Sequence, residues 1–122
     1  MRFMIVRKAD RDTEAGKLPS QELLDAMGAY NAELVKAGVW RGGDGLHPSR
    51  EAVRVTFTEG EPSLTDGPFT ETKELIAGFT LIEVAGWDEA LHWVRRWPRI
   101  DGDGEVELEL RRVYEASELG AE

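Results

Sequence analysis

The 122-residue chain carries 15 Lys and Arg against 24 Asp and Glu, for a net charge of −9, with 41% hydrophobic residues and no cysteine. This composition is typical of one soluble globular domain over residues 1–122, with an ordered core at about 2–114, and it excludes disulfides and thiolate chemistry. The acidic balance argues against nucleic acid as a partner, and the short apolar runs argue against a membrane. Because the N-terminal stretch is typical of a strand and not of a signal peptide, we expect a cytoplasmic location.

The first half of the chain predicts a strand, a loop and a helix. Residues 2–8 are rich in β-branched and aromatic side chains, whereas residues 9–19 are polar and end in Pro19. Ser20 is a plausible N-cap, and Gly38 stands where a left-handed C-cap is expected. Between them, apolar side chains recur at spacings of four, three and four along one helical face: Leu23, Met27, Tyr30 and Leu34.

The second half predicts strands around one further helix. Val39 and Trp40 could begin a strand, which the glycines of RGGDG at 41–45 would soon break. Alternation from residue 51 predicts a half-buried strand with Val53, Val55 and Phe57 on one face, and residues 78–86 predict another. A second helix begins at Trp87 with Asp88 as N-cap and stops at Pro98, before a last strand over 105–111.

The predicted order is β, α, β, β with a hairpin-like excursion, α, β. This order is typical of the α+β, ferredoxin-like split βαβ arrangement, βαββαβ with an extra hairpin, in which both helices cover one face of an antiparallel sheet. The other face must then meet water or a partner. Because its residues are mixed rather than wholly polar, we expect a homodimer with a cleft between sheet and partner.

The stretch TDGPFTETKE at 65–74 is unusual for a turn. Asp66, Gly67 and Pro68 fit turn chemistry, since Asp bonds nearby backbone N–H groups and Pro presets φ. Phe69, Glu71 and Lys73 are not explained by the turn. The charged residues could instead form a solvated hairpin rim with weak ion pairs, or fold over a cleft and meet a polar ligand.

This stretch, followed by GFTLIEV at 78–84, together with GLHP at 45–48, EAVRVTF at 51–57 and WDEALHWVRRWP at 87–98, resembles the DGPF subgroup of the YciI-like (YCII-related) family. The resemblance runs from Phe3 to about Tyr114. It implies a ferredoxin-like dimeric α/β barrel and a small bacterial protein, in a family mostly without assigned activity. Some family genes lie beside extracytoplasmic-function sigma factors, which raises a non-enzymatic interaction or regulatory module as the alternative function.

One branch of the family is proposed to use a His on the first helix and an Asp before a Pro after the second. The corresponding positions here hold Met27 and Trp97, neither of which transfers protons at neutral pH. A catalytic role copied from that branch is therefore in doubt. The leading hypothesis is a dimer that binds an unidentified small molecule in a sheet-side cleft, without a cofactor.

If the chain is an enzyme, we expect proton transfer by the rare groups of two loops. His47 would be the base or acid, Asp66 its orienting carboxylate and Lys73 an anion-stabilising charge. A surface residue without a partner is the plainer explanation for His47. We expect ligand contacts from Trp40, Phe69, Glu71 and Tyr30, although core packing is the plainer explanation for Tyr30.

Metal binding finds little support in the sequence. The two histidines, His47 and His92, show no HxxxH, HxH or HExxH spacing, and His92 lies off the apolar helix stripe, where we expect it to be exposed. The run DGDGE at 101–105 lacks the remaining positions of a calcium loop, so we interpret it as a turn before the last strand.

Overall fold

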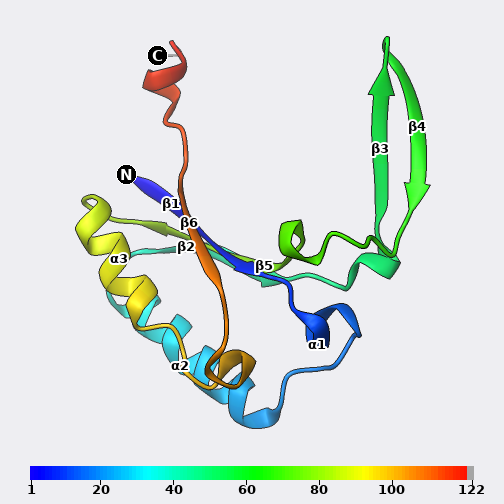
Figure 1. The fold of residues 1–122 in the computed structure, drawn as a ribbon. Coiled ribbons are helices and arrows are strands. Elements are labelled where there is room, and N and C mark those ends of the chain that lie inside the picture. The colour runs from blue at the N-terminus through cyan, green and yellow to red at the C-terminus, as the bar shows by residue number, and fades with distance from the viewer. Residues whose placement is uncertain (121–122) are drawn as a thin grey trace.

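The computed structural model describes residues 1–120 as one sheet with helices, from which a long hairpin projects (Figure 1). The strands are β1 (Arg2–Lys8), β2 (Trp40–Gly45), β3 (Val53–Thr58), β4 (Glu61–Asp66), β5 (Ile76–Glu83) and β6 (Leu108–Arg112). The α-helices are α1 (Arg11–Glu14), α2 (Gln21–Lys36) and α3 (Trp87–Arg95). Short 3-10 turns are η1 (Ser49–Glu51), η2 (Thr72–Glu74), η3 (Asp101–Gly104) and η4 (Ala116–Leu119).

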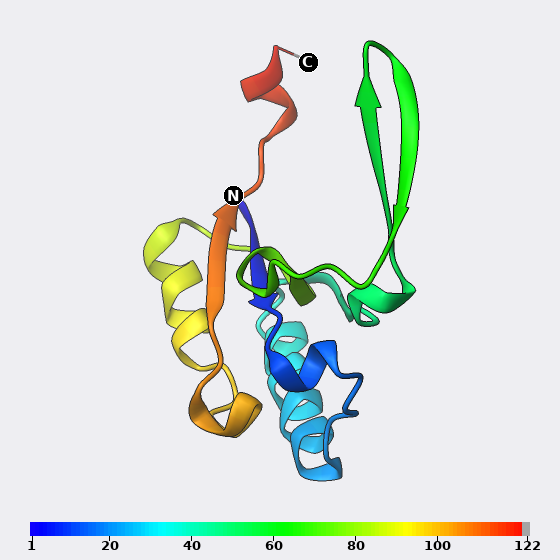
Figure 2. The same cartoon turned by 45° about the vertical axis from the view of Figure 1, so that its right-hand side comes forward.

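Four strands form an antiparallel sheet in the order β2-β5-β1-β6. The two long helices, α2 and α3, lie on the same side of this sheet (Figure 2). Element order and strand order are compatible with the predicted ferredoxin-like fold. The chain shown is a single copy, so the dimeric barrel stays a prediction.

The core lies between this sheet and the two helices. Phe3 and Ile5 of β1 and Ile82 of β5 are fully buried. They pack against helix and loop side chains, among them Tyr30, Leu34, Val39, Ala90, Trp93 and Trp97. As predicted, the Ser20 side chain caps α2 by accepting a hydrogen bond from the Leu23 N–H, and Gly38 follows the helix with φ of 76°.

The prediction that RGGDG breaks the second strand is wrong, because β2 runs through all five residues. Gly42 adopts φ of 136° where the pairing with β5 shifts register. A Cβ on Gly43 would lie 2.8 Å from the Phe79 carbonyl oxygen. These glycines therefore let β2 bulge and approach β5 closely, and such close approach is a use of strand glycine that local propensity does not reveal.

Two local predictions also need correction. Asp88 is not the N-cap of α3: Gly86 takes that position, and Asp88 lies in the first turn. The predicted loop at 9–19 contains α1, where the Asp10 side chain accepts from the Thr13 N–H and the Thr13 hydroxyl accepts from the Asp10 N–H. This reciprocal cap stabilises a helix too short for a periodic signal.

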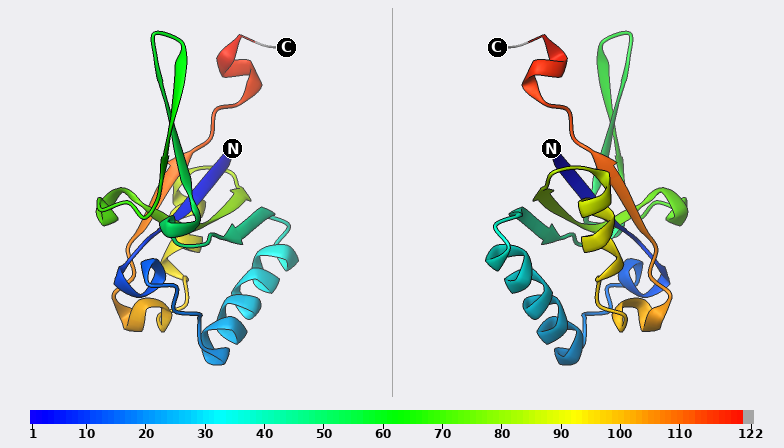
Figure 3. Two further views of the ribbon diagram at one scale, coloured as in Figure 1. Left: turned by 90° about the vertical axis from the view of Figure 1, so that its right-hand side faces the viewer. Right: turned by 90° about the vertical axis from the view of Figure 1, so that its left-hand side faces the viewer.

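The hairpin of β3 and β4 leaves the body of the molecule on the side opposite α2 and α3 (Figure 3). We call this hairpin, residues 53–66, the arm. Pro62 is accommodated because the sheet has two strands, so each has a free edge. All twelve strand residues of the arm are exposed. The half-buried strand predicted over 53–57 is therefore a strand, but an exposed one.

Candidate functional site

The turn after the arm is fastened to η1. The Gly67 N–H donates to the Ala52 carbonyl at 2.9 Å, and the Phe69 N–H donates to the Ser49 hydroxyl oxygen at 2.9 Å. The Ser49 hydroxyl in turn donates to the Glu14 carboxylate at 2.6 Å, and the same carboxylate accepts from the Ser49 N–H. Ser49 is buried, so these bonds leave its polar atoms paired and hold the turn against the body.

Phe69 and Glu71 both contact the base of the arm. The Arg54 guanidinium lies 4.0 Å above the centroid of the Phe69 ring, and it forms an ion pair with Glu71 at 3.8 Å. We call these three side chains the brace. Two of the three residues that turn chemistry leaves unexplained, Phe69 and Glu71, therefore hold the base of the arm.

The sheet face opposite α2 and α3, here called the open face, is apolar at its centre. Met4 pairs with Leu81, and Val6 with Phe79, across β1 and β5. These four side chains alternate with the core residues Phe3 and Ile5, so they point away from the helices. Charged pairs flank them: Arg41 with Glu83 at 3.1 Å, and Arg111 with Glu109 at 3.2 Å.

A small hollow lies where β1 ends. It measures about 110 Å³ and is lined by Lys8, Ala9, Lys73 and Glu107. Lys8 follows Val6 by two positions, so both side chains leave β1 on the same face. The hollow thus combines two ammonium groups and one carboxylate. A wider hollow of about 400 Å³ is lined by residues 85–89 at the start of α3.

The structure separates the predicted catalytic residues into different surroundings. The imidazole Nδ1 of His47 lies 3.0 Å from the Glu51 carboxylate, and its side chain is 82% exposed. Asp66 ends β4 with an exposed side chain, and Lys73 lies at the hollow. The carboxylate beside His47 is therefore Glu51, four positions on, and His47 shares no hydrogen bond with Asp66 or Lys73 in the described part of the chain. Their catalytic roles stay predictions.

Two predicted ligand contacts lie on the helix side of the sheet. Tyr30 is buried, its hydroxyl donates to the Trp93 carbonyl at 2.7 Å, and burial raises the pKa of this hydroxyl. Trp40 is half-buried and packs against the same core. Both lie away from the open face, because Tyr30 is on α2 and Trp40 pairs with the core residue Ile82. His92 is exposed, as predicted.

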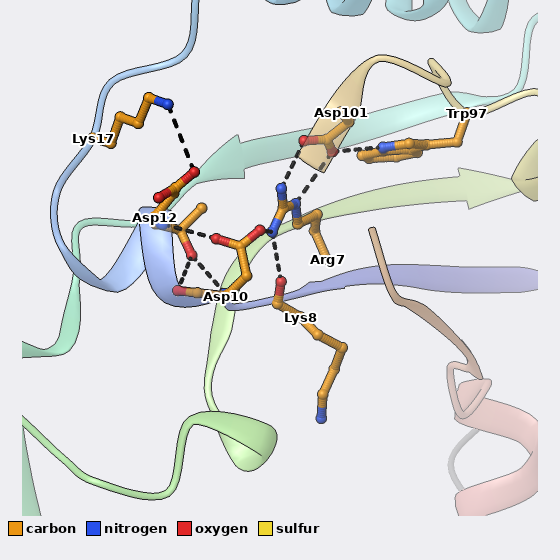
Figure 4. A network of polar contacts seen from close by, with 8 residues as sticks. Arg7, Lys8, Asp10, Asp12, Lys17, Trp97 and Asp101 are labelled. Carbon is orange, nitrogen blue, oxygen red and sulfur yellow. Dashed lines mark hydrogen bonds and ion pairs between the residues drawn. The ribbon is translucent and has the colours of Figure 1, made fainter. Parts of the chain in front are cut away.

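Sequence reasoning missed a buried ionic network at the end of β1 (Figure 4). Arg7 donates to both oxygens of Asp101, at 3.2 and 2.6 Å, and Trp97 Nε1 donates to the same carboxylate at 2.9 Å. Asp10 accepts from Arg7 at 3.0 Å. Burial alone would lower the pKa of Arg7, but the Asp101 bonds and charge outweigh it and raise that pKa. Each charged group of this network has a hydrogen-bond partner inside the network, which indicates a structural role.

Two further observations concern metal binding and membrane-spanning helices. Within residues 1–120, no three His, Cys, Asp or Glu side chains gather as a metal site would require. No helix in this part of the chain has the length and hydropathy to span a bilayer.

Comparisons with known proteins agree on one relationship. The family model described as YCII-related domain matches residues 1–115. An uncharacterised protein of Rhizobium meliloti (strain 1021) is 32% identical over 104 residues, 84% of each chain. The structure resembles 5-chloro-2-hydroxyhydroquinone dehydrochlorinase (TftG) from Burkholderia phenoliruptrix AC1100, solved with 2,5-dihydroxybenzoquinone, with a TM-score of 0.50 at 20% identity over 97% and 98% of the two chains. At that identity the likeness concerns the fold.

Proposed function

Since the chain belongs to the YCII-related family, we propose that it binds a small organic anion on the open face and does so as a homodimer. The single observation that carries the proposal is the hollow at the end of β1. It is lined by Lys8, Ala9, Lys73 and Glu107, and Lys8 leaves β1 on the same face as Val6, which pairs with Phe79. A flat ligand with an apolar body and a carboxylate or phenolate group fits this pairing.

The charges favour an anion over a cation. Lys8 and Lys73 together outweigh Glu107 at the hollow, although the chain as a whole has a net charge of −9. A local positive site on an acidic protein concentrates an anionic ligand there and not elsewhere on the surface. The ligand named for the structural neighbour, 2,5-dihydroxybenzoquinone, is a flat molecule with acidic hydroxyl groups, and it supports this class of ligand as an analogy of fold.

Turnover of a bound ligand is a prediction separate from its binding. Lys73 keeps the anion-stabilising role expected from the sequence. His47 lies on the loop before η1 and pairs with Glu51 at the end of η1, away from the residues that line the hollow. Proton transfer to a ligand in the hollow would therefore need a movement of this loop or a group from a second chain. The DGPF subgroup remains part of the proposal, supported by the way Gly67 and Phe69 fasten the arm.

Calorimetric titration with 2,5-dihydroxybenzoquinone and with benzoate tests the proposal. We expect both probes to bind, with an affinity that falls as salt is added. Lys8→Ala or Lys73→Ala should lower that affinity about tenfold, the effect of one charge-assisted contact. Lys36→Ala is the matched control, because Lys36 ends α2 on the other side of the sheet. Equal affinities in all three variants, or no heat with either probe, would contradict the proposal.

The second candidate is an interaction module without an active site, whose partner belongs to a regulatory system such as an extracytoplasmic-function sigma factor. The exposed apolar side chains of the arm favour it. Under this alternative, Phe69→Ala changes the apparent mass in solution and Asp66→Asn does not, because Phe69 supports Arg54 of the arm, whereas the Asp66 side chain is exposed at the base of the arm. Neither probe anion would bind.

A further inference from the structure

Glu107 lines the same hollow as Lys8 and Lys73 but carries the opposite charge. It comes just before β6 and lies across from Lys8, whose N–H donates to the Glu107 carbonyl at 3.1 Å. This bond continues the register of the two strands, in which Arg7 pairs with Leu108. Opposite charges directly across two strands commonly attract each other, so an ion pair would be the ordinary arrangement here.

No such ion pair is present within residues 1–120. The side chains of Lys8, Lys73 and Glu107 line the hollow without an ion pair or hydrogen bond to one another in this part of the chain. Glu109, two positions further on, does pair with Arg111 at 3.2 Å. The hollow therefore presents two ammonium groups and one carboxylate whose hydrogen-bonding capacity is left to water or to a ligand.

The backbone around the hollow is held by hydrogen bonds from several directions. Arg7 belongs to the buried ionic network, and its Nη1 donates to the Lys8 carbonyl at 2.8 Å (Figure 4). The Ala9 N–H donates to the Leu75 carbonyl at 2.9 Å, and the Lys8 N–H bonds to Glu107 as described. These bonds keep the walls of the hollow in place, as a largely preformed ligand site requires.

Glu107 discriminates between kinds of anion. Its carboxylate repels a ligand that brings negative charge alone, which offsets part of the attraction of the two ammonium groups. A ligand with a hydroxyl group can donate a hydrogen bond to the same carboxylate, and such bonds to a charged acceptor are stronger than neutral ones. Specificity arises from attractive and repulsive elements in combination. The volume of about 110 Å³ admits the polar end of a ligand.

We propose that Glu107 makes the hollow selective for hydroxylated organic acids. The acid group binds at Lys8 and Lys73, and a hydroxyl group elsewhere on the ligand donates to Glu107. This inference rests on the proposed anion site and narrows its ligand class, from flat organic anions to those that also carry a hydrogen-bond donor. A dianion is disfavoured, because its second charge meets the carboxylate.

Three benzoates substituted at the 3-position separate these effects in calorimetric titrations. 3-Hydroxybenzoate has a donor, 3-methoxybenzoate has the same oxygen without the proton, and isophthalate has a second carboxylate. The wild-type chain is expected to bind 3-hydroxybenzoate about tenfold more tightly than 3-methoxybenzoate. Glu107→Ala should abolish this preference and strengthen isophthalate binding about fivefold, the effect of one like charge removed in water. Glu107→Gln keeps an acceptor without the charge, so part of the preference should remain.

Glu105→Gln is the matched control. It removes the same charge from an exposed carboxylate that does not line the hollow, so all three affinities should stay within about twofold of wild type. Glu107 is exposed as well, and its variants should keep the unfolding midpoint of the wild type. Any loss of selectivity then reports on the hollow and not on folding.

The possible outcomes separate this inference from the anion site. Equal binding of 3-hydroxybenzoate and 3-methoxybenzoate by the wild type, or a preference that survives in Glu107→Ala, overturns the inference and leaves the anion site standing. A Glu107-dependent preference that Lys8→Ala and Lys73→Ala do not weaken supports the role of Glu107 and contradicts the lysine site. Absence of binding by benzoate and by all three substituted benzoates overturns both.

Discussion

The carbonyl oxygen of Ser49 occupies the place where a Cβ on Gly67 would stand. The backbone of the turn after the arm thus lies directly against η1, and the neighbouring bonds from Gly67 to Ala52 and from Phe69 to Ser49 hold it there. The glycine of the DGPF stretch is therefore required by close approach between two backbones, in addition to any turn preference. The stretch joins the arm to the body.

Gly67→Ala is expected to lower the free energy of unfolding by about 1–3 kcal/mol, as overpacking against an immobile backbone does. The added methyl group meets the Ser49 carbonyl, which is a part of the backbone and cannot rotate away. Urea denaturation measures the change. Gly28→Ala is the control: nothing lies within 4 Å of a Cβ there, and the site is inside α2, so a gain of about 0.5–1 kcal/mol is expected. Equal effects at the two sites would contradict the contact.

Ser49→Ala is expected to cost about 1–3 kcal/mol, because it leaves the Phe69 N–H and the Glu14 carboxylate without their shared partner. Thermal and urea unfolding report the loss. Ser63→Ala, on the exposed polar face of the arm, should change stability by less than about 0.5 kcal/mol. If Glu14→Gln and Ser49→Ala act on one contact, their effects combine to less than their sum, and strict additivity would argue against the link.

The local features of this fold could be predicted from the sequence, whereas the contacts between distant segments could not. Ser20 and Gly38 are recognisable in the sequence as helix ends, since capping depends on residues three or four positions away. The strand at 41–45 was missed because its glycines serve an approach to β5, about 35 positions along the chain. Periodicity carries no information about such a neighbour.

In the candidate site too, the sequence indicates individual residues but not the contacts between distant segments. Lys73, Phe69 and Glu71 were singled out by composition, but composition did not indicate that two of them hold Arg54. Ser49 and Glu14 are 35 positions apart, and Arg7 and Asp101 are 94 apart. Each pair is invisible in sequence because Ser, Glu, Arg and Asp are common surface residues, and burial becomes evident after the chain has folded.

Asp101→Ala is expected to destabilise the chain by about 3–5 kcal/mol, since it leaves Arg7 buried without its bidentate partner. Trp97→Phe removes one indole donor to the same carboxylate and should cost about 1 kcal/mol. Glu105→Ala, an exposed carboxylate just beyond η3, is the control and should be within about 0.5 kcal/mol of wild type. Similar losses for Asp101 and Glu105 would contradict a buried ion pair.

Asp10 makes stability depend on pH in the acid range. Burial by itself would raise the pKa of its carboxyl, but the Thr13 N–H and the Arg7 guanidinium outweigh burial and hold that pKa below the ordinary 3.8. A lowered folded pKa stabilises the protein above the unfolded value, and the benefit is lost as pH falls through the folded value. Wild type should therefore exceed Asp10→Asn in stability at neutral pH, since Asn keeps the cap, and the difference should shrink as pH falls below about 4 and vanish once pH lies below the lowered folded pKa. A difference that is constant with pH would contradict this.

Arg54 is expected to control how often the arm opens at its base. Removing the stacked guanidinium in Arg54→Gln forfeits about 0.5–1 kcal/mol of cation–π attraction, together with the weak pair to Glu71. Amide hydrogen exchange in β3 and β4 should then become about two to five times faster, while amides of β1 and β5 keep their rates as an internal control. Arg54→Lys keeps the charge and loses the flat stacking surface, so it should fall between the two. Exchange that accelerates equally in the sheet and in the arm would mean that Arg54 supports the whole fold and not the direction of the arm.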